Sequence, residues 1–142
     1  MSTEDEVRNA SNQFYAALNK MVNGNAHALS DIWSHHPTVT TMHPIGGRQV
    51  GWKDVWKTWE QTAQVASEGQ VKLQDQYINV VGDMAYEIGV ENAGFNLAGQ
   101  KLTDQVLVTN IYLKEDGKWK IIHHHSDLSP AMVEVLHKLQ NA

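Results

Sequence analysis

The sequence contains no cysteine, and this absence excludes disulfides, thiolate nucleophiles, zinc fingers and iron–sulfur clusters together. Basic residues are also few, because 11 Lys and Arg stand against 16 Asp and Glu, giving a formal net charge of -5. Without a basic surface the chain cannot neutralise many phosphates, so we expect no nucleic-acid partner. No apolar run approaches the ~18 residues of a membrane span, and the acidic start is unlike a signal peptide. We therefore expect no membrane partner and a cytoplasmic location.

What the sequence does hold is 142 residues of ordinary globular composition, including five tryptophans and eight histidines. This length suits one core, so we expect residues 1–142 to form a single domain. Most tryptophans and histidines in proteins fill a core or lie on loops, and the same is expected here. Their number also allows a pocket with aromatic walls.

Hydrophobic spacing predicts helices first and strands afterwards. Apolar residues at three- and four-residue intervals predict helices over residues 3–23 and 26–33 and from Trp52 onward, with Thr3 as the start of a capping box. Extended patterns then follow over residues 71–81, 84–95, 102–115 and 118–126, after a short β-rich segment at 38–42. Pro130 opens a short C-terminal helix. This order is typical of an α+β fold, in which a curved antiparallel sheet wraps over the helices and leaves a cavity.

The three consecutive histidines at 123–125 lie on the last predicted strand, so neighbouring side chains leave opposite faces of the sheet. A two-residue turn before this strand would mix charged and apolar residues on both faces. A three-residue turn pairs Thr109 with His123 and separates the two kinds of residue, so we predict this register. It directs His123 and His125 into the cavity and His124 outward.

Several roles are open for these inward histidines. Thr109, Thr103 or backbone groups could satisfy His123 and His125 as purely structural residues. They could instead project into a ligand cavity as hydrogen-bond donors or a general base. A zinc site with His43 as the third imidazole is the weakest alternative, because strand spacing plus one distant histidine is a poor metal signature. We therefore expect no metal and no cofactor.

Short segments occur here in an order and spacing that resemble one known family. They lie at residues 14–19, 32–34, 39–40, 43–44, 51–52, 81–86, 108–110 and 116–126. Together they resemble the SnoaL-like branch of the nuclear transport factor 2-like (NTF2-like, ketosteroid isomerase-like) superfamily. The resemblance implies a cone-shaped α+β barrel with three N-terminal helices packed in a curved antiparallel sheet, a pocket at the open end, and commonly a homodimer through the outer sheet face. It implies no activity, because the superfamily holds isomerases, cyclases, dehydratases, hydrolases and association domains.

Isomerase-like members of that superfamily use a carboxylate base with a tyrosine and a protonated acid. Only Tyr15 matches the tyrosine by its place in the chain, and the last strand carries His123 and His125 where an acid would be needed. Glu87 and Glu91 share one parity of their strand, opposite an apolar parity, so we expect both to lie on the outer face or at an interface. Steroid isomerase chemistry is therefore not expected.

Two functions follow as hypotheses. The first is a pocket for a small apolar molecule with isomerase, cyclase or hydrolase type acid–base chemistry, in which His123 and His125 are candidate catalytic residues and Tyr15 is a weaker one. Its expected ligand-binding residues are Trp33, His43, Trp52, Trp56, Tyr86, Thr109, His123 and His125. The second is a non-catalytic, dimeric binding or association module. A cavity above ~300 Å³ would favour the first and a filled cone the second. Under either hypothesis we expect a homodimer, because the outer face of the sheet should carry an apolar strip. The strip consists of Tyr77, Val106, Val108, Tyr112 and Ile122.

Overall fold

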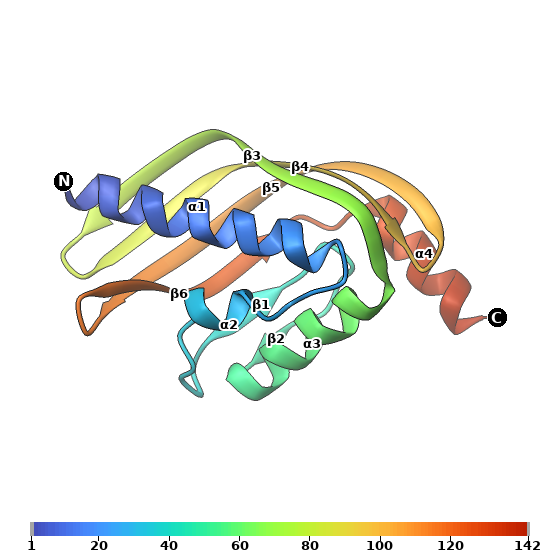
Figure 1. The fold of residues 1–142 in the computed structure, drawn as a ribbon, viewed down its shortest axis with the longest axis horizontal. Coiled ribbons are helices and arrows are strands. Elements are labelled where there is room, and N and C mark those ends of the chain that lie inside the picture. The colour runs from blue at the N-terminus through green and yellow to red at the C-terminus, as the bar shows by residue number, and fades with distance from the viewer. Residues whose placement is uncertain (1, 142) are drawn as a thin grey trace.

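The computed structural model describes residues 2–141, and its elements follow the predicted order (Figure 1). They are α1 (Thr3–Met21), α2 (Leu29–Ile32), β1 (Thr40–Met42), β2 (Gln49–Val50), α3 (Trp52–Val65), β3 (Ala66–Val81), β4 (Met84–Leu97), β5 (Gln100–Glu115), β6 (Lys118–Ser126) and α4 (Pro130–Gln140). The short strand β2 was not predicted, and β3 begins several residues earlier than expected. Ser2, rather than Thr3, caps α1 by accepting a hydrogen bond of 3.1 Å from the backbone N–H of Asp5.

All six strands form one curved sheet in the order β2-β1-β6-β5-β4-β3. Neighbouring strands are antiparallel except for β1 and β6, which run parallel. In Figure 1 the long strands β3, β4 and β5 arch over α1, while α2 and α3 lie toward the short strands and α4 lies at the far end. The α+β fold with a curved sheet over helices is confirmed, although the sheet is not closed into a barrel.

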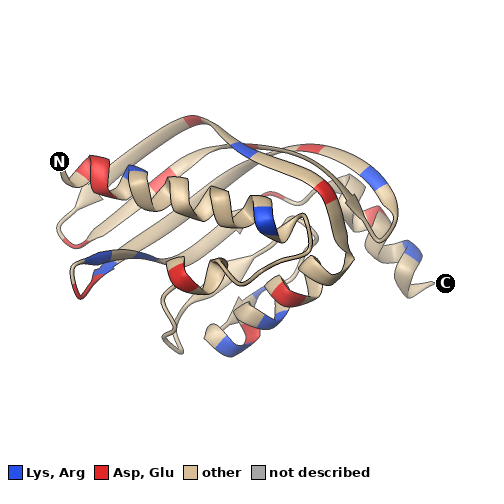
Figure 2. Ribbon diagram, in the orientation of Figure 1, with Lys and Arg blue, Asp and Glu red and all other residues tan. Residues whose placement is uncertain are grey.

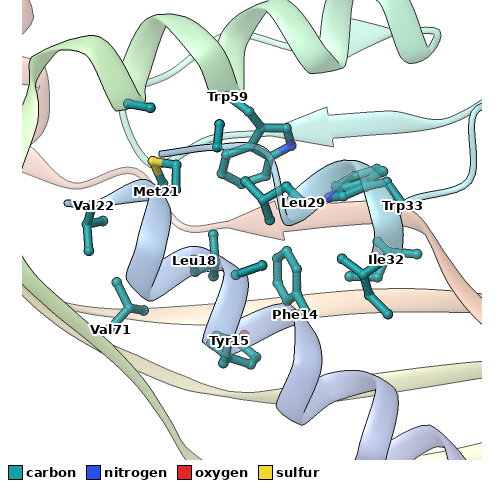
Figure 3. Close-up of a cluster of buried hydrophobic side chains, with 14 of the residues drawn as sticks. Phe14, Tyr15, Leu18, Met21, Val22, Leu29, Ile32, Trp33, Trp59 and Val71 are labelled. Atoms are coloured by element: carbon teal, nitrogen blue, oxygen red, sulfur yellow. The ribbon is translucent and has the colours of Figure 1, made fainter. Parts of the chain in front are cut away.

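The core lies between the helices and the concave face of the sheet. Phe14 projects from α1 toward Leu29 and Trp59 (Figure 3), and its ring centroid lies 6.4 Å from that of Trp59. Trp33 is also fully buried beside this cluster. Helix α1 therefore contributes the apolar stripe that its three- and four-residue spacing predicted.

The turn between β5 and β6 differs from the prediction. Glu115 pairs with Lys118, so the loop holds only Asp116 and Gly117, which have φ angles of 49° and 79°. Positive φ at both positions is the geometry of a type I′ turn, which the Asp-Gly sequence favours. The predicted three-residue turn is wrong.

The two-residue turn does pair Lys114 with Trp119 and Leu113 with Lys120, and a β-bulge farther along β6 then shifts the register. Tyr112 pairs with Ile121, but the next pair joins Ile111 to His123, so Ile122 is the extra residue. The bulge reverses the alternation: Ile121 faces the core before it, and His124 faces the core after it. A single added residue thus keeps apolar side chains inside at one end of the strand and changes which histidine is inside at the other.

The predicted orientation of the histidine run is therefore wrong. His124 is only 2% exposed and points to the helix-covered side, while His125 is exposed on the outer face with His123. The parities of β4 are also the reverse of those predicted. Glu87 and Glu91 are buried under the sheet, and Tyr86 and Ile88, at 39% and 42% exposure, lie on its outer face.

Figure 2 shows acidic and basic residues interspersed along α3 and near the ends of the long strands. Among the helices of residues 2–141, none combines the length and apolar content that crossing a bilayer requires.

Candidate functional site

A cavity of about 80 Å³ lies under the concave face of the sheet, between α1, α3, β4, β6 and α4. Its walls are mainly apolar, with Leu18, Met21, Val22, Ile45, Phe95, Leu97 and Met132 among the lining residues. It is smaller than the ~300 Å³ typical of pockets for drug-sized ligands. Volume alone therefore does not favour a ligand pocket over a filled interior, whereas the polar groups in the wall do point to a chemical role.

Glu91 is the carboxylate of this cavity. It projects from β4, is 7% exposed, and accepts a hydrogen bond of 2.7 Å from the Tyr15 hydroxyl. The Ser126 hydroxyl donates to its other oxygen at 3.3 Å. Burial raises the pKa of Glu91 to about 7, and the two hydroxyl donors only partly offset this rise. Both protonation states of Glu91 are therefore populated near neutral pH.

His43 follows β1 and enters the cavity wall from the opposite side. Its Nε2 lies 2.8 Å from the Thr58 hydroxyl oxygen, and its ring meets Trp59 edge-on at 4.6 Å between centroids. Burial lowers the pKa of His43 to about 4, so its imidazole is neutral at physiological pH.

His124, from β6, is the second imidazole in the wall. Its Nδ1 lies 2.6 Å from Asn110 Oδ1, and its Nε2 lies 3.3 Å from the Ser126 hydroxyl oxygen. Burial, and then the nearby His43 ring at 6.3 Å, hold the pKa of His124 well below its usual value. Two neutral imidazoles and one carboxylate of raised pKa thus meet in one apolar cavity.

A second buried carboxylate, Glu87, lies behind the first. It accepts hydrogen bonds from Asn110 at 3.0 Å, Tyr112 at 2.8 Å and Gln76 at 2.6 Å. Asn110 also donates to the Tyr15 hydroxyl at 3.1 Å, so an unbroken chain of hydrogen bonds joins Glu87 to Glu91. Burial raises the pKa of Tyr15 well above its usual value, so this hydroxyl stays protonated and donating.

The structure brings together few of the residues expected at the site. His43 lines the cavity, and Tyr15 reaches it through Glu91. The others lie elsewhere: Trp33 is in the core, Trp52 and Trp56 are half-buried on α3, and Tyr86, Thr109, His123 and His125 are on the outer side of the sheet.

Sequence reasoning missed Glu91, His124, Ser126, Asn110 and Glu87. The glutamates share the parity of Ala85, Phe95 and Leu97, which are all buried on β4, but Tyr86 and Ile88 on the other parity are apolar as well and gave a competing signal. The bulge that turns His124 inward leaves no comparable mark on the sequence.

The zinc alternative fails on geometry. His43 lies inside the cone, whereas His123 and His125 lie on the outer side of the sheet, so the three imidazoles cannot bind one ion. Within residues 2–141, no group of three or more His, Cys, Asp or Glu side chains is arranged to hold a metal ion.

Comparison with known proteins gives one match to a family. The model of the SnoaL-like domain family matches residues 7–132. No curated protein matches the chain.

Solved structures share the fold at low identity. A candidate dehydratase of the NTF2-like family from Streptomyces avermitilis has 23% identity and a TM-score of 0.78, over 89% of this chain and 95% of that one. The CaMKII hub of S. rosetta has 18% identity and a TM-score of 0.73, over 91% and 98%. A candidate ketosteroid isomerase from Shewanella frigidimarina has 21% identity and a TM-score of 0.68, over 84% and 92%. These likenesses show the NTF2-like, ketosteroid isomerase-like fold, which hosts both enzymes and association domains.

Proposed function

Since the chain belongs to the SnoaL-like domain family, we propose that its cavity binds a small apolar molecule with a carbonyl group and moves a proton on it, with Glu91 as the proton carrier. The observation that carries this proposal is a carboxylate buried in an apolar wall, with a pKa of about 7. A group that titrates near the working pH can both take and return a proton. Apolar walls favour a neutral ligand that leaves this carboxylate desolvated.

The surrounding groups suit this chemistry. Tyr15 donates to Glu91 Oε2 and so positions the carboxylate. Each neutral imidazole, His43 and His124, has one N–H with which to bind a ligand or a neighbouring side chain. The volume of about 80 Å³ favours a ligand of few atoms, and a larger one would need lining side chains such as Met132 of α4 to move.

The first test is proton exchange on small ketones and enones, which we select by thermal shift because ligands of the folded state raise the melting temperature. In D₂O the protein should catalyse deuterium exchange at the carbon beside the carbonyl group. Glu91→Gln should slow this exchange by roughly 10²–10⁴-fold, the usual contribution of a general acid or base. The matched control is Glu60→Gln, because Glu60 is exposed on α3. Equal exchange in the two variants would refute the role of Glu91.

A second candidate function is association with another copy of this chain through the outer face of the sheet. Tyr77, Tyr86, Ile88 and Leu107 are 55%, 39%, 42% and 62% exposed on adjoining strands of this face. They replace most of the predicted strip, because Val106, Val108 and Tyr112 are buried inside and Ile122 is half-buried against the core, while Tyr77 is exposed on the outer face. Contiguous apolar surface of this kind usually marks an interface.

We expect the protein to sediment at twice its 15.9 kDa chain mass at micromolar concentration. Ile88→Lys should shift it to the single-chain mass, because a charge would be buried in the middle of the interface. The control is Leu139→Lys, which makes the same kind of change at an exposed apolar residue of α4. Sedimentation of the unmodified protein as a single chain would exclude this association.

A further inference from the structure

The side-chain orientation of Asn110 is fixed by its neighbours. One end of the amide lies 3.0 Å from Glu87 Oε1 and 3.1 Å from the Tyr15 hydroxyl. Glu87 Oε1 also accepts from Tyr112, so the Asn110 atom that faces it must be the donating NH₂ group. The amide oxygen of Asn110 therefore faces His124.

This orientation determines the proton position on His124. An amide oxygen only accepts, so the hydrogen bond of 2.6 Å requires a hydrogen on His124 Nδ1. A neutral imidazole carries one N–H, which leaves a lone pair on Nε2, 3.3 Å from the Ser126 hydroxyl oxygen. We propose that Asn110, oriented by Glu87, fixes His124 in its Nδ1–H tautomer, so that Nε2 can receive a proton that Ser126 relays from Glu91.

The relay is balanced atom by atom. Ser126 Oγ lies 3.3 Å from Glu91 Oε1 and 3.3 Å from His124 Nε2. When protonated Glu91 gives its proton to Ser126 Oγ, the serine hydroxyl proton passes to His124 Nε2, and the products are a carboxylate and an imidazolium. This inference rests on the proposed function for its use. Because the pKa of His124 is held well below its usual value and that of Glu91 is raised to about 7, the imidazolium is short-lived and the proton returns to Glu91 along the same path.

His43 provides a built-in comparison, because its contacts fix the opposite tautomer. The Thr58 hydroxyl donates its hydrogen to the backbone carbonyl of Val55 at 2.7 Å. Thr58 Oγ1 must therefore accept from His43, and Nε2 of His43 carries the hydrogen. Two buried neutral imidazoles, 6.3 Å apart, are thus expected in opposite forms.

Long-range ¹H–¹⁵N correlation spectra of the full chain at about pH 8 distinguish the two forms directly. His124→Gln and His43→Gln identify the two ring signals among those of the eight histidines. We expect the Nδ1–H pattern for His124 and the Nε2–H pattern for His43. An Nε2–H pattern for His124 in the unmodified protein would overturn the proposal, and no ligand or activity is needed for this result.

Two variants test the roles of Asn110 and Ser126 separately. Asn110→Leu removes the acceptor, so His124 should change to the Nε2–H form while His43 keeps its own. If His124 keeps its Nδ1–H in a folded Asn110→Leu protein, then Asn110 does not determine the tautomer of His124.

Ser126→Ala should leave both tautomers unchanged and raise the pKa of Glu91 above about 7, because a donor to the carboxylate is lost. The side-chain ¹³C shift of Glu91 reports this pKa. An unchanged Glu91 pKa would remove Ser126 from the relay.

Discussion

Replacing Glu91 with glutamine should stabilise the folded protein by about 3 kcal/mol at about pH 8 and leave its stability unchanged below about pH 4.5. The reason is that burial raises the pKa of Glu91 from 4.5 to about 7. Between these values the folded state binds more protons than the unfolded state, so the free energy of unfolding falls as pH rises. Above about pH 7 the folded protein holds a desolvated carboxylate, and glutamine removes that cost while still accepting from Tyr15.

Urea unfolding of Glu91→Gln and the unmodified protein at equal chain concentration, from about pH 5 to 8, measures this difference. The Glu60→Gln control should track the unmodified protein at every pH. A Glu91→Gln protein that is less stable than the unmodified one at about pH 8 would mean that the carboxylate is not destabilised in the fold. A gain in stability together with a loss of proton exchange would fit the trade-off expected of a functional site.

The sequence was sufficient to predict the elements and their order, because local signals specify them. Three- and four-residue spacing identified the core stripe of α1, and Asp116-Gly117 marked the last hairpin. The resemblance to the SnoaL-like branch is likewise confirmed by a match over residues 7–132.

The faces of β4, β5 and β6 could not be assigned in the same way, because both faces of this sheet carry apolar residues. Ile88 and Leu107 lie outside and Phe95 lies inside, so hydrophobicity alone does not tell the inner parity from the outer one. The prediction that the apolar parity is the inner one places Glu87 and Glu91 outside, and it is wrong because both are buried. The bulge at Ile122 compounded the error, since it depends on how β6 packs rather than on a local sequence signal.

His124→Gln should destabilise the protein, whereas His125→Gln, at the neighbouring position in the chain, should leave its stability almost unchanged. His124 packs against Phe14 and Trp59 and bonds to Asn110, so its replacement should cost about 1–3 kcal/mol at about pH 7.5. His125 is exposed, and its replacement should change stability by less than about 0.5 kcal/mol.

The pH dependence of stability in these two variants distinguishes the effect of burying a titratable ring from the effect of losing its contacts. Burial lowers the pKa of His124, so in the unmodified protein the neutral ring contributes stability that is complete above pH 6.5 and is lost as the pH falls. His43 acts in the same direction, and its shift from 6.5 to about 4 corresponds to about 3 kcal/mol. Glutamine does not titrate, so the cost of His124→Gln should shrink below about pH 6.5, whereas His125→Gln should parallel the unmodified protein.

Both histidine variants are best compared in the Glu91→Gln background, because Glu91 stabilises the folded state as the pH falls from about 7 to 4.5 and so masks the opposite effect of the buried imidazoles. With that contribution removed, acid should destabilise the protein more steeply than in the unmodified chain. Substituting His124 should then flatten the profile and substituting His125 should not. The reverse result, with His125 controlling the acid response, would place His125 rather than His124 on the helix-covered side and would contradict the bulge at Ile122.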